Sequence, residues 1–303
     1  MIKKISVETS EVLGHGAMLL FSLCVSVSYI LGAMVANDIE PGAITAARFL
    51  IGAIVMGALL FISKNLKNED FKKPWRFFVL GLSIVIYFVL MFEALKTASS
   101  LSLSVVFTLT PLIALFLEYF LNKRVTLKAF LAIFLGAMGA IWVIFEGNLN
   151  NLLTFKIGYG ELLFFWGCVG HALYAILIPI LNKGENAASQ TLGTLSAGFL
   201  ILILIFTNDV LETNWLGLSP LIWITIIYLA TIATAFTFFL IQFAAKRISA
   251  SKVMAYTYAV PFWVALGEII INCSFPNTNI IFGGLIIAFA LLMLISDNTK
   301  AKM

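Results

Sequence analysis

Two carboxylates occupy equivalent positions in the two halves of this 303-residue chain, each inside an otherwise apolar segment. Glu118 and Glu268 are 150 residues apart, and each follows a proline, Pro111 or Pro261, by seven residues. An ionisable side chain inside an apolar span is a candidate for proton exchange. We therefore expect this pair either to couple a process to protons or to form interfacial carboxylates that hydrogen-bond to neighbouring helices.

Arg48 is the only basic residue well inside an apolar segment. At 1.5 Å per helical residue it lies about 10 Å from the start of its segment at Pro41. The planar guanidinium group matches the geometry of a carboxylate or a phosphate. Arg48 could thus bind the acidic group of a substrate, or pair permanently with Glu93 on the next segment.

His171 and several aromatic residues lie in the same kind of apolar surroundings. A lone histidine there is either a packing hydrogen-bond donor or a proton relay that contacts substrate. Aromatic side chains with a polar atom could line a cavity for a partly apolar molecule, although such residues in membrane helices also serve packing. The aromatic candidates are Tyr29, Tyr87, Tyr174, Tyr256, Tyr258 and Trp263.

Composition places these residues in a membrane protein. The chain is 61% hydrophobic and 11% charged, with a mean hydropathy of +1.05. Apolar runs long enough for a helix of roughly 20 residues to cross a bilayer recur throughout, without the short alternating pattern of a membrane β-barrel. We expect ten membrane-spanning helices, at about 13–35, 41–63, 75–97, 99–121, 127–146, 158–182, 190–207, 219–244, 250–272 and 278–296.

The distribution of basic residues predicts the orientation. Most lysines and arginines fall in alternate connecting segments, whereas the others contain only Lys96 and Lys156. Because basic segments stay cytoplasmic, we expect an integral bacterial inner-membrane protein with both termini in the cytoplasm and no nucleic-acid partner. Cys24 and Cys168 lie inside predicted spans and Cys273 lies at the end of one, and the three give neither a disulfide framework nor a metal site.

The second half of the chain repeats the first at an offset of 150 residues. Equivalent pairs include Ala94 and Ala244, Lys96 and Lys246, Ser99 and Ser249, and Asn122 and Asn272. Five crossings are an odd number, so the second copy must be inverted in the membrane. We predict an all-α polytopic protein of two inverted five-helix repeats, at 12–146 and 158–296, an architecture typical of secondary transporters.

The two repeated prolines lie near the middle of their spans. Pro111 and Pro261 each remove the backbone hydrogen bond to the carbonyl four residues earlier, on Phe107 and Thr257. A freed carbonyl at membrane depth must face protein groups or a wet cavity. We expect either a bend that faces the transport pathway or a permanent kink that shapes packing.

The repeated segments resemble the EamA-type ten-helix exporters of the drug/metabolite transporter superfamily. The resemblance covers about residues 12–296 and rests on five short matches: 46–50 (AARFL), 93–99 (EALKTAS), 109–112 (LTPL), 160–163 (GELL) and 171–175 (HALYA). It implies a central cavity lined by helices 1 to 4 and 6 to 9. The sequence departs from the family pattern at His171, where tryptophan is usual, and at the turn 122–124, which lacks the common acidic residue.

Helices 5 and 10 carry small residues at four-residue spacing, which lets helix backbones approach closely. These are Ala132, Gly136 and Ala140 in helix 5, and Gly284 and Ala288 in helix 10. The pattern fits contact within the chain or the seam of a homodimer.

No nucleotide-binding motif is present and no loop is long enough for a catalytic domain, so we expect no enzyme activity and no cofactor. The sequence predicts a gradient-driven exporter of small metabolites such as amino acids, working by alternating access. The alternatives are uptake or exchange of a nucleoside-like cofactor such as S-adenosylmethionine, a lipid-linked-sugar flippase, or a non-transporting membrane subunit. A flippase should show a lateral opening with a basic headgroup pocket, whereas a metabolite carrier should show an enclosed central cavity.

Overall fold

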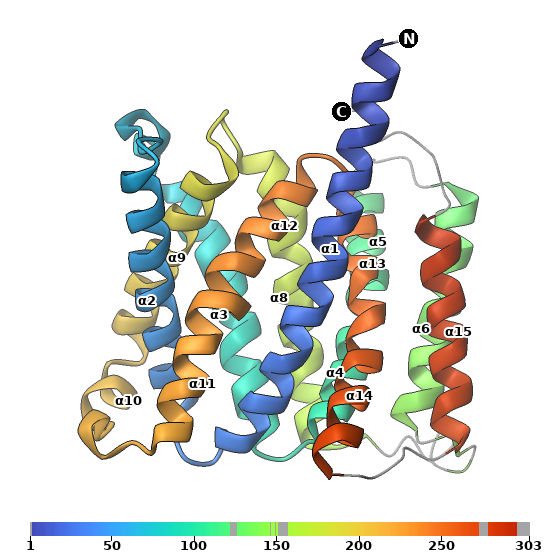
Figure 1. The fold of residues 1–303 in the computed structure, drawn as a ribbon. Coiled ribbons are helices and arrows are strands. Elements are labelled where there is room, and N and C mark those ends of the chain that lie inside the picture. The colour runs from blue at the N-terminus through green and yellow to red at the C-terminus, as the bar shows by residue number, and fades with distance from the viewer. Residues whose placement is uncertain are drawn as a thin grey trace.

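The computed structural model describes residues 2–121, 126–145, 147–148, 150, 157–272 and 278–295. Every regular element in this part of the chain is helical (Figure 1). Eight helical segments are long and apolar enough to cross a membrane, and two shorter apolar helices occupy the positions of the expected fifth and tenth spans. The predicted fold class, ten transmembrane helices in two inverted five-helix repeats, is confirmed.

The spans begin and end close to the expected residues. The first repeat contains α1 (Ile2–Val35), α2 (Pro41–Ile62), α3 (Trp75–Leu95), α4 (Ser100–Phe107), α5 (Thr110–Phe120) and α6 (Leu127–Ile144). The second contains α8 (Tyr159–Leu181), α9 (Ala187–Ile205), α11 (Pro220–Ala230), η3 (Thr231–Phe236), α12 (Thr237–Ala245), α13 (Ala250–Ala255), η4 (Tyr256–Ala259), α14 (Val260–Asn272) and α15 (Thr278–Ile295). Short helices η1 (Asn68–Phe71), α10 (Thr207–Glu212) and η2 (Trp215–Gly217) lie in connections.

Both repeated prolines break their spans, and protein groups satisfy the carbonyls that they free. The fourth span divides into α4 and α5 around Thr108, and the Thr110 hydroxyl donates to the Phe107 carbonyl at 2.6 Å. In the ninth span η4 separates α13 from α14, and the Thr257 carbonyl accepts from the Val260 N–H. The repeated serines also have a common role, since Ser99 and Ser249 each accept a backbone N–H at the start of the helix that follows.

The eighth span contains a π-helical turn that the sequence did not predict. This turn, η3, joins α11 to α12, and Ala233, Thr234 and Ala235 within it are buried. π-helical turns are rare and often accompany functional sites.

Close packing at glycines brings the two repeats together. A Cβ atom at Gly170 of α8 would lie 2.6 Å from the Ser83 carbonyl of α3, and one at Gly81 of α3 would lie 2.8 Å from the Gly198 nitrogen of α9. Only glycine permits these backbone approaches. The glycines therefore hold the middle of α3 against two helices of the other repeat.

The helices α6 and α15 form a pair at one side of the bundle (Figure 1). A Cβ atom at Gly139 would lie 3.0 Å from the Gly283 carbonyl, and one at Gly283 would lie 3.0 Å from the Gly139 carbonyl, so the two backbones approach closely at these glycines. Ala132, Gly136 and Ala140 are buried within the chain, whereas Gly284 and Ala288 of α15 are exposed. The small residues of α6 are buried within the chain, and a homodimer seam through the fifth and tenth spans stays a prediction.

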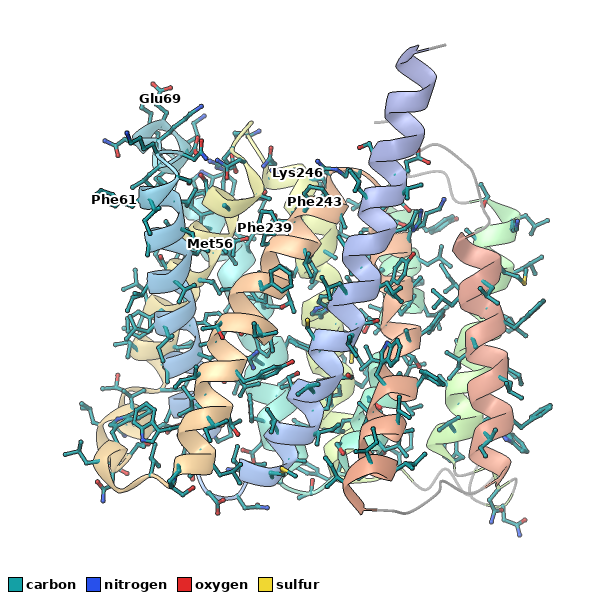
Figure 2. All side chains as sticks on the ribbon, in the orientation of Figure 1. Met56, Phe61, Glu69, Phe239, Phe243 and Lys246 are labelled. Carbon is teal, nitrogen blue, oxygen red and sulfur yellow. The ribbon has the colours of Figure 1, made fainter. Side chains whose placement is uncertain are left out.

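The two ends of the helix bundle differ in charge. We call the end that carries the connections 63–74, 182–186 and 246–249 the basic end, and the other the opposite end. Figure 2 shows Glu69 and Lys246 at the basic end. The first and second repeats cross between these ends in opposite directions, so Lys246 lies at the basic end and its equivalent Lys96 at the opposite end.

Candidate functional site

Arg48 lies buried between the two repeats, with a side chain that is 0% exposed. Its Nε donates to the Thr234 hydroxyl at 2.8 Å, and its Nη2 donates to the Ala233 carbonyl at 3.2 Å. Both acceptors belong to the π-helical turn η3 of the second repeat. The π turn thus presents a hydroxyl and a carbonyl to a guanidinium group that comes from the first repeat.

The remaining face of the guanidinium group packs on an aromatic ring. Its Cζ lies 3.8 Å from the centroid of Phe88, a cation–π distance. Nη1 has no hydrogen-bond partner among the described residues, and neither does the hydroxyl of Thr45, one helical turn earlier on α2. Arg48 therefore presents an unused donor in a buried site.

The Arg48–Glu93 pair that the sequence suggested is not formed. Glu93 instead pairs with Lys96 at 3.1 Å and is 43% exposed at the opposite end. The two side chains lie at different depths in the helix bundle. Glu93 lies near the last turn of α3, whereas Arg48 lies two turns inside α2, at the level of Phe88. No described carboxylate forms an ion pair with Arg48.

Tyr87 and His171 meet beside this site. Their rings are 4.6 Å apart, and Phe107 lies 5.0 Å from the histidine ring. Tyr87 also shares a 3.1 Å hydrogen bond with Tyr29 of α1. The Nδ1 atom of His171 is buried and has no hydrogen-bond partner among the described residues.

Tyr174 and Gln242 extend the buried cluster towards α12. The Gln242 amide nitrogen donates to the Tyr174 hydroxyl at 2.9 Å, while the Gln242 carbonyl oxygen has no partner in the described part of the chain. Phe238 lies 5.3 Å from Tyr174 and 5.9 Å from Phe88, the ring beneath Arg48. We call Arg48, Tyr87, Phe88, His171, Tyr174 and Gln242 the central cluster.

Three predicted pathway residues lie outside the central cluster. Tyr256 hydrogen-bonds to Nδ1 of His15 at 2.9 Å, and the Trp263 indole donates to Ser22 at 3.2 Å, so both attach the ninth span to α1. Tyr258 donates to the Ile133 carbonyl of α6 at 3.0 Å. These contacts are structural links between spans. Pro111 and Pro261 are buried at the breaks described above.

The two repeated carboxylates have different surroundings. Glu118 is buried on α5, with a 3% exposed side chain. Glu268 on α14 is half-buried and accepts a short hydrogen bond from the Ser100 hydroxyl at the start of α4. Ser100 thereby links Glu268 to the other repeat.

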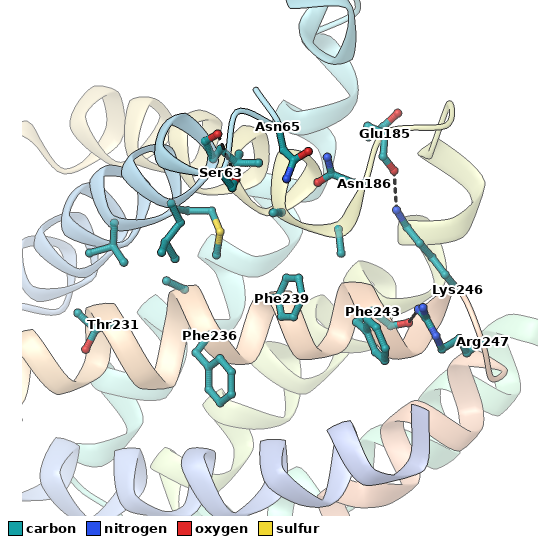
Figure 3. A pocket seen from close by; sticks show the side chains of 17 residues that line it. Ser63, Asn65, Glu185, Asn186, Thr231, Phe236, Phe239, Phe243, Lys246 and Arg247 are labelled. Carbon is teal, nitrogen blue, oxygen red and sulfur yellow. Dashed lines mark hydrogen bonds between the residues drawn. The ribbon is translucent and has the colours of Figure 1, made fainter. Parts of the chain in front are cut away.

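A buried ion pair joins the two repeats at the basic end. We call Arg76, Glu185 and Lys246, with the contacts described next, the Glu185 clasp. Arg76 of α3 donates to the Glu185 carboxylate at 2.7 Å, and the two side chains are only 3% and 2% exposed. The same arginine donates to the Leu181 carbonyl at 2.6 Å. Lys246, from the end of α12, donates to the Glu185 main-chain carbonyl at 2.7 Å (Figure 3). Glu185 therefore connects three segments, including the start of α3 from the first repeat.

The opposite end has a more exposed cluster of ion pairs, which lies within the first repeat. Lys96, the equivalent of Lys246, pairs with Glu40 and Glu93, each at 3.1 Å. Burial opposes the charge of Lys96, but its two carboxylate partners outweigh this and raise its pKa. In contrast, burial lowers the pKa of Lys246, against the influence of Glu185. The two ends thus use equivalent lysines in different electrostatic surroundings.

A groove of about 860 Å³ lies between α2, the start of α9 and the η3–α12 segment (Figure 3). Figure 2 shows its residues Met56, Phe239, Phe243 and Lys246 following one another towards the basic end. Its walls are mostly apolar, and its polar residues other than Thr231 gather at that end. The groove was not predicted from the sequence.

Sequence reasoning also missed Glu185, Arg76 and Thr234. Glu185 and Arg76 looked like ordinary loop and interfacial charges, and Thr234 like one of many polar residues in a span. A usable signal was present for Glu185, because it is the one acidic residue in a connection predicted to lie at the basic, cytoplasmic side. No local signal marks Thr234, since its role depends on the π-helical turn.

These features define a duplicated helical carrier whose buried polar side chains lie between two inverted repeats. Residues 12–145 and 158–296 each match the EamA-like transporter family, and the chain belongs to that family. It is 27% identical over 246 residues to the Bacillus subtilis (strain 168) protein described as "Uncharacterized transporter YyaM", with 80% of each chain covered. A solved crystal structure shares the fold with a TM-score of 0.71 at 18% identity, covering 94% of this chain and 97% of the other.

Proposed function

We propose that this protein exports small metabolites such as amino acids across the bacterial inner membrane by alternating access. The observation that carries the proposal is Arg48, a buried cation between the repeats with an unused Nη1 donor and no carboxylate partner among the described residues. A substrate carboxylate would supply the missing acceptor through the bidentate geometry that arginine favours.

Other members of the central cluster fit the rest of an amino acid. The free carbonyl oxygen of Gln242 can accept from an ammonium group, and the rings of Tyr87, Phe88 and Tyr174 offer apolar and cation–π contacts. A buried polar group without a partner costs about 1–3 kcal/mol. A zwitterion that satisfies Arg48 and Gln242 together would therefore gain affinity from both.

The Glu185 clasp suits alternating access, because Arg76 comes from the first repeat and Glu185 from the second. In the proposed cycle the repeats 12–146 and 158–296 move relative to each other, and this clasp closes the cytoplasmic side. Both termini are cytoplasmic in this proposal because the basic end follows the positive-inside rule. The clasp is formed in this structure.

A second candidate is transport of a lipid-linked molecule, which the groove favours because it is lateral and its end is basic. In this second candidate the groove, and not the central cluster, would be the substrate site. Arg48 and the other members of the central cluster are not among the residues that line the groove.

The experiment is a thermal-shift screen followed by flux measurement. Ligands that bind only the folded protein raise its apparent stability, so the purified protein is heated with amino acids, polyamines, nucleosides and S-adenosylmethionine. Stabilisation by amino acids, followed by their flux in proteoliposomes, would support the proposal. Flipping of a fluorescent lipid-linked sugar without amino-acid flux would support the second candidate instead.

We predict that protons couple through one of the repeated carboxylates. Replacing Glu268 or Glu118 by Gln removes the titrating group while keeping its size, so transport by the responsible variant should lose its dependence on an imposed proton gradient. Counterflow of substrate without a gradient should persist in that variant. Ser100→Ala is the control for Glu268, because it removes the hydrogen bond and keeps the carboxylate. An intact gradient response in both Gln variants would exclude the pair from coupling.

A further inference from the structure

The groove beside α12 has two chemically different parts (Figure 3). Its length is walled by apolar side chains, among them Val55, Met56, Phe236 and Phe239. Its basic end contains Asn65, Asn186, Lys246 and Arg247, together with Glu185, whose carboxylate is paired with Arg76. An apolar channel with a cationic end matches a molecule that joins a hydrocarbon chain to an anionic group.

The two cations at this end have no carboxylate partners among the described residues. The Lys246 ammonium donates to a main-chain carbonyl, that of Glu185, and the Glu185 carboxylate is already paired with Arg76. Neither lining cation therefore forms an ion pair with a described carboxylate.

Arg247 is held in place while part of its guanidinium group stays unused. Its Nη1 donates to the Phe243 carbonyl at 2.7 Å, and its Cζ lies 3.4 Å from the centroid of the Phe243 ring. Its Nε is buried and has no hydrogen-bond partner in the described part of the chain. Arg247 therefore offers a positioned donor beside the lysine.

The groove opens at the side of the bundle rather than only at its end. Leu59 on one wall is 55% exposed and Phe236 on the other is 36% exposed, and both are apolar. Surfaces of this kind face lipid in a membrane protein. No member of the central cluster lines the groove.

We propose that the groove binds one anionic phospholipid from the leaflet at the basic end. Its phosphate lies at Lys246 and Arg247, and an acyl chain lies along Phe243, Phe239 and Phe236. The cavity volume of about 860 Å³ is within the usual range of ligand sites, roughly 300–1,000 Å³. A water-soluble anion would occupy only the polar end and leave the apolar walls exposed to water, which is unfavourable.

The site is separate from the proposed transport site. None of the hydrogen bonds of Lys246 or Arg247 involves the central cluster. Because Lys246 also donates to the Glu185 carbonyl of the clasp, lipid binding is measured directly and not through transport.

The test measures lipid retention by native mass spectrometry. The purified full-length protein is equilibrated with equal amounts of phosphatidylglycerol and phosphatidylcholine, and we expect one phosphatidylglycerol to be retained preferentially. The double variant Lys246→Gln and Arg247→Gln should lose roughly 30-fold in affinity for phosphatidylglycerol, the factor expected for two basic residues near a lipid headgroup. The matched control, Lys67→Gln and Lys73→Gln, removes two exposed basic-end charges outside the groove and should retain the lipid.

A photoreactive phosphatidylglycerol with its label in the acyl chain tests the apolar part. Crosslinks should fall within 55–60 and 236–243. Equal retention of both lipids, an unchanged double variant, or crosslinks confined to other helices would overturn the proposal. Displacement of the lipid by inorganic phosphate at millimolar concentration would also overturn it, because that result would mean that the apolar walls contribute nothing.

Discussion

Replacing Arg48 by Met should abolish amino-acid transport without unfolding the protein. Removing one partner of a buried, hydrogen-bonded charge pair costs at least about 2 kcal/mol, so substrate affinity should fall roughly 30-fold or more. The ligand-free protein should keep or gain thermal stability, because Arg48 is a buried cation without a described carboxylate partner and an apolar side chain avoids its desolvation. Thermal melts and proteoliposome flux measure the two quantities.

Three further variants make this prediction specific. Arg48→Lys keeps a charge but loses the planar fork, so it should recover only part of the affinity. Thr234→Val removes the acceptor of Nε and should weaken transport less than Arg48→Met, since Thr234 positions the arginine. Ile54→Ala changes an exposed residue of the same helix and should transport normally. If Arg48→Met unfolds while ligand-free, or transports as well as wild type, Arg48 is not the substrate-binding residue.

The architecture was predictable because hydropathy and the repeat are properties of the sequence alone. Ten apolar runs give five crossings in each half of the chain. Because five is an odd number, the second repeat must be inverted in the membrane, whichever residues its side chains contact. The repeat also marked Ser99 and Ser249, whose shared role as helix caps depends only on the residues that immediately follow. Features that arise within a few residues of the chain could thus be predicted.

The contacts of the site could not be predicted, because they join residues far apart in the chain. Arg48 was assigned Glu93 as its alternative partner from charge and neighbouring spans, but its acceptors lie 185 and 186 residues away on a π-helical turn. Tyr258 was grouped with the pathway aromatics, yet its hydroxyl reaches the Ile133 carbonyl. Which face of each helix meets which neighbour is decided by close approaches at positions such as Gly81 and Gly170.

Removing Glu185 should open and destabilise the basic end. Glu185→Ala leaves the Arg76 guanidinium buried without its carboxylate, and breaking a buried pair in this way costs about 3–5 kcal/mol. The free energy of unfolding in detergent should fall by that amount. The matched control is Glu40→Ala at the opposite end, where the partner Lys96 keeps Glu93 and the lost pair is exposed, so the expected cost is about 1 kcal/mol or less.

A labelling rate distinguishes a gate from a purely structural ion pair. Ser189 is fully buried in the first turn of α9, close in sequence to Glu185, so a cysteine at this position in a cysteine-free background should react slowly with a membrane-impermeant maleimide. If the clasp closes the basic end, Glu185→Ala should speed this reaction at temperatures where the protein remains folded, and a bound amino acid should change the rate in the wild type. If instead the ion pair only stabilises the fold, Glu185→Ala lowers the free energy of unfolding while the labelling rate of the folded protein stays unchanged. The clasp would then have no part in alternating access, even though the buried charge pair is needed to keep α3 against the second repeat.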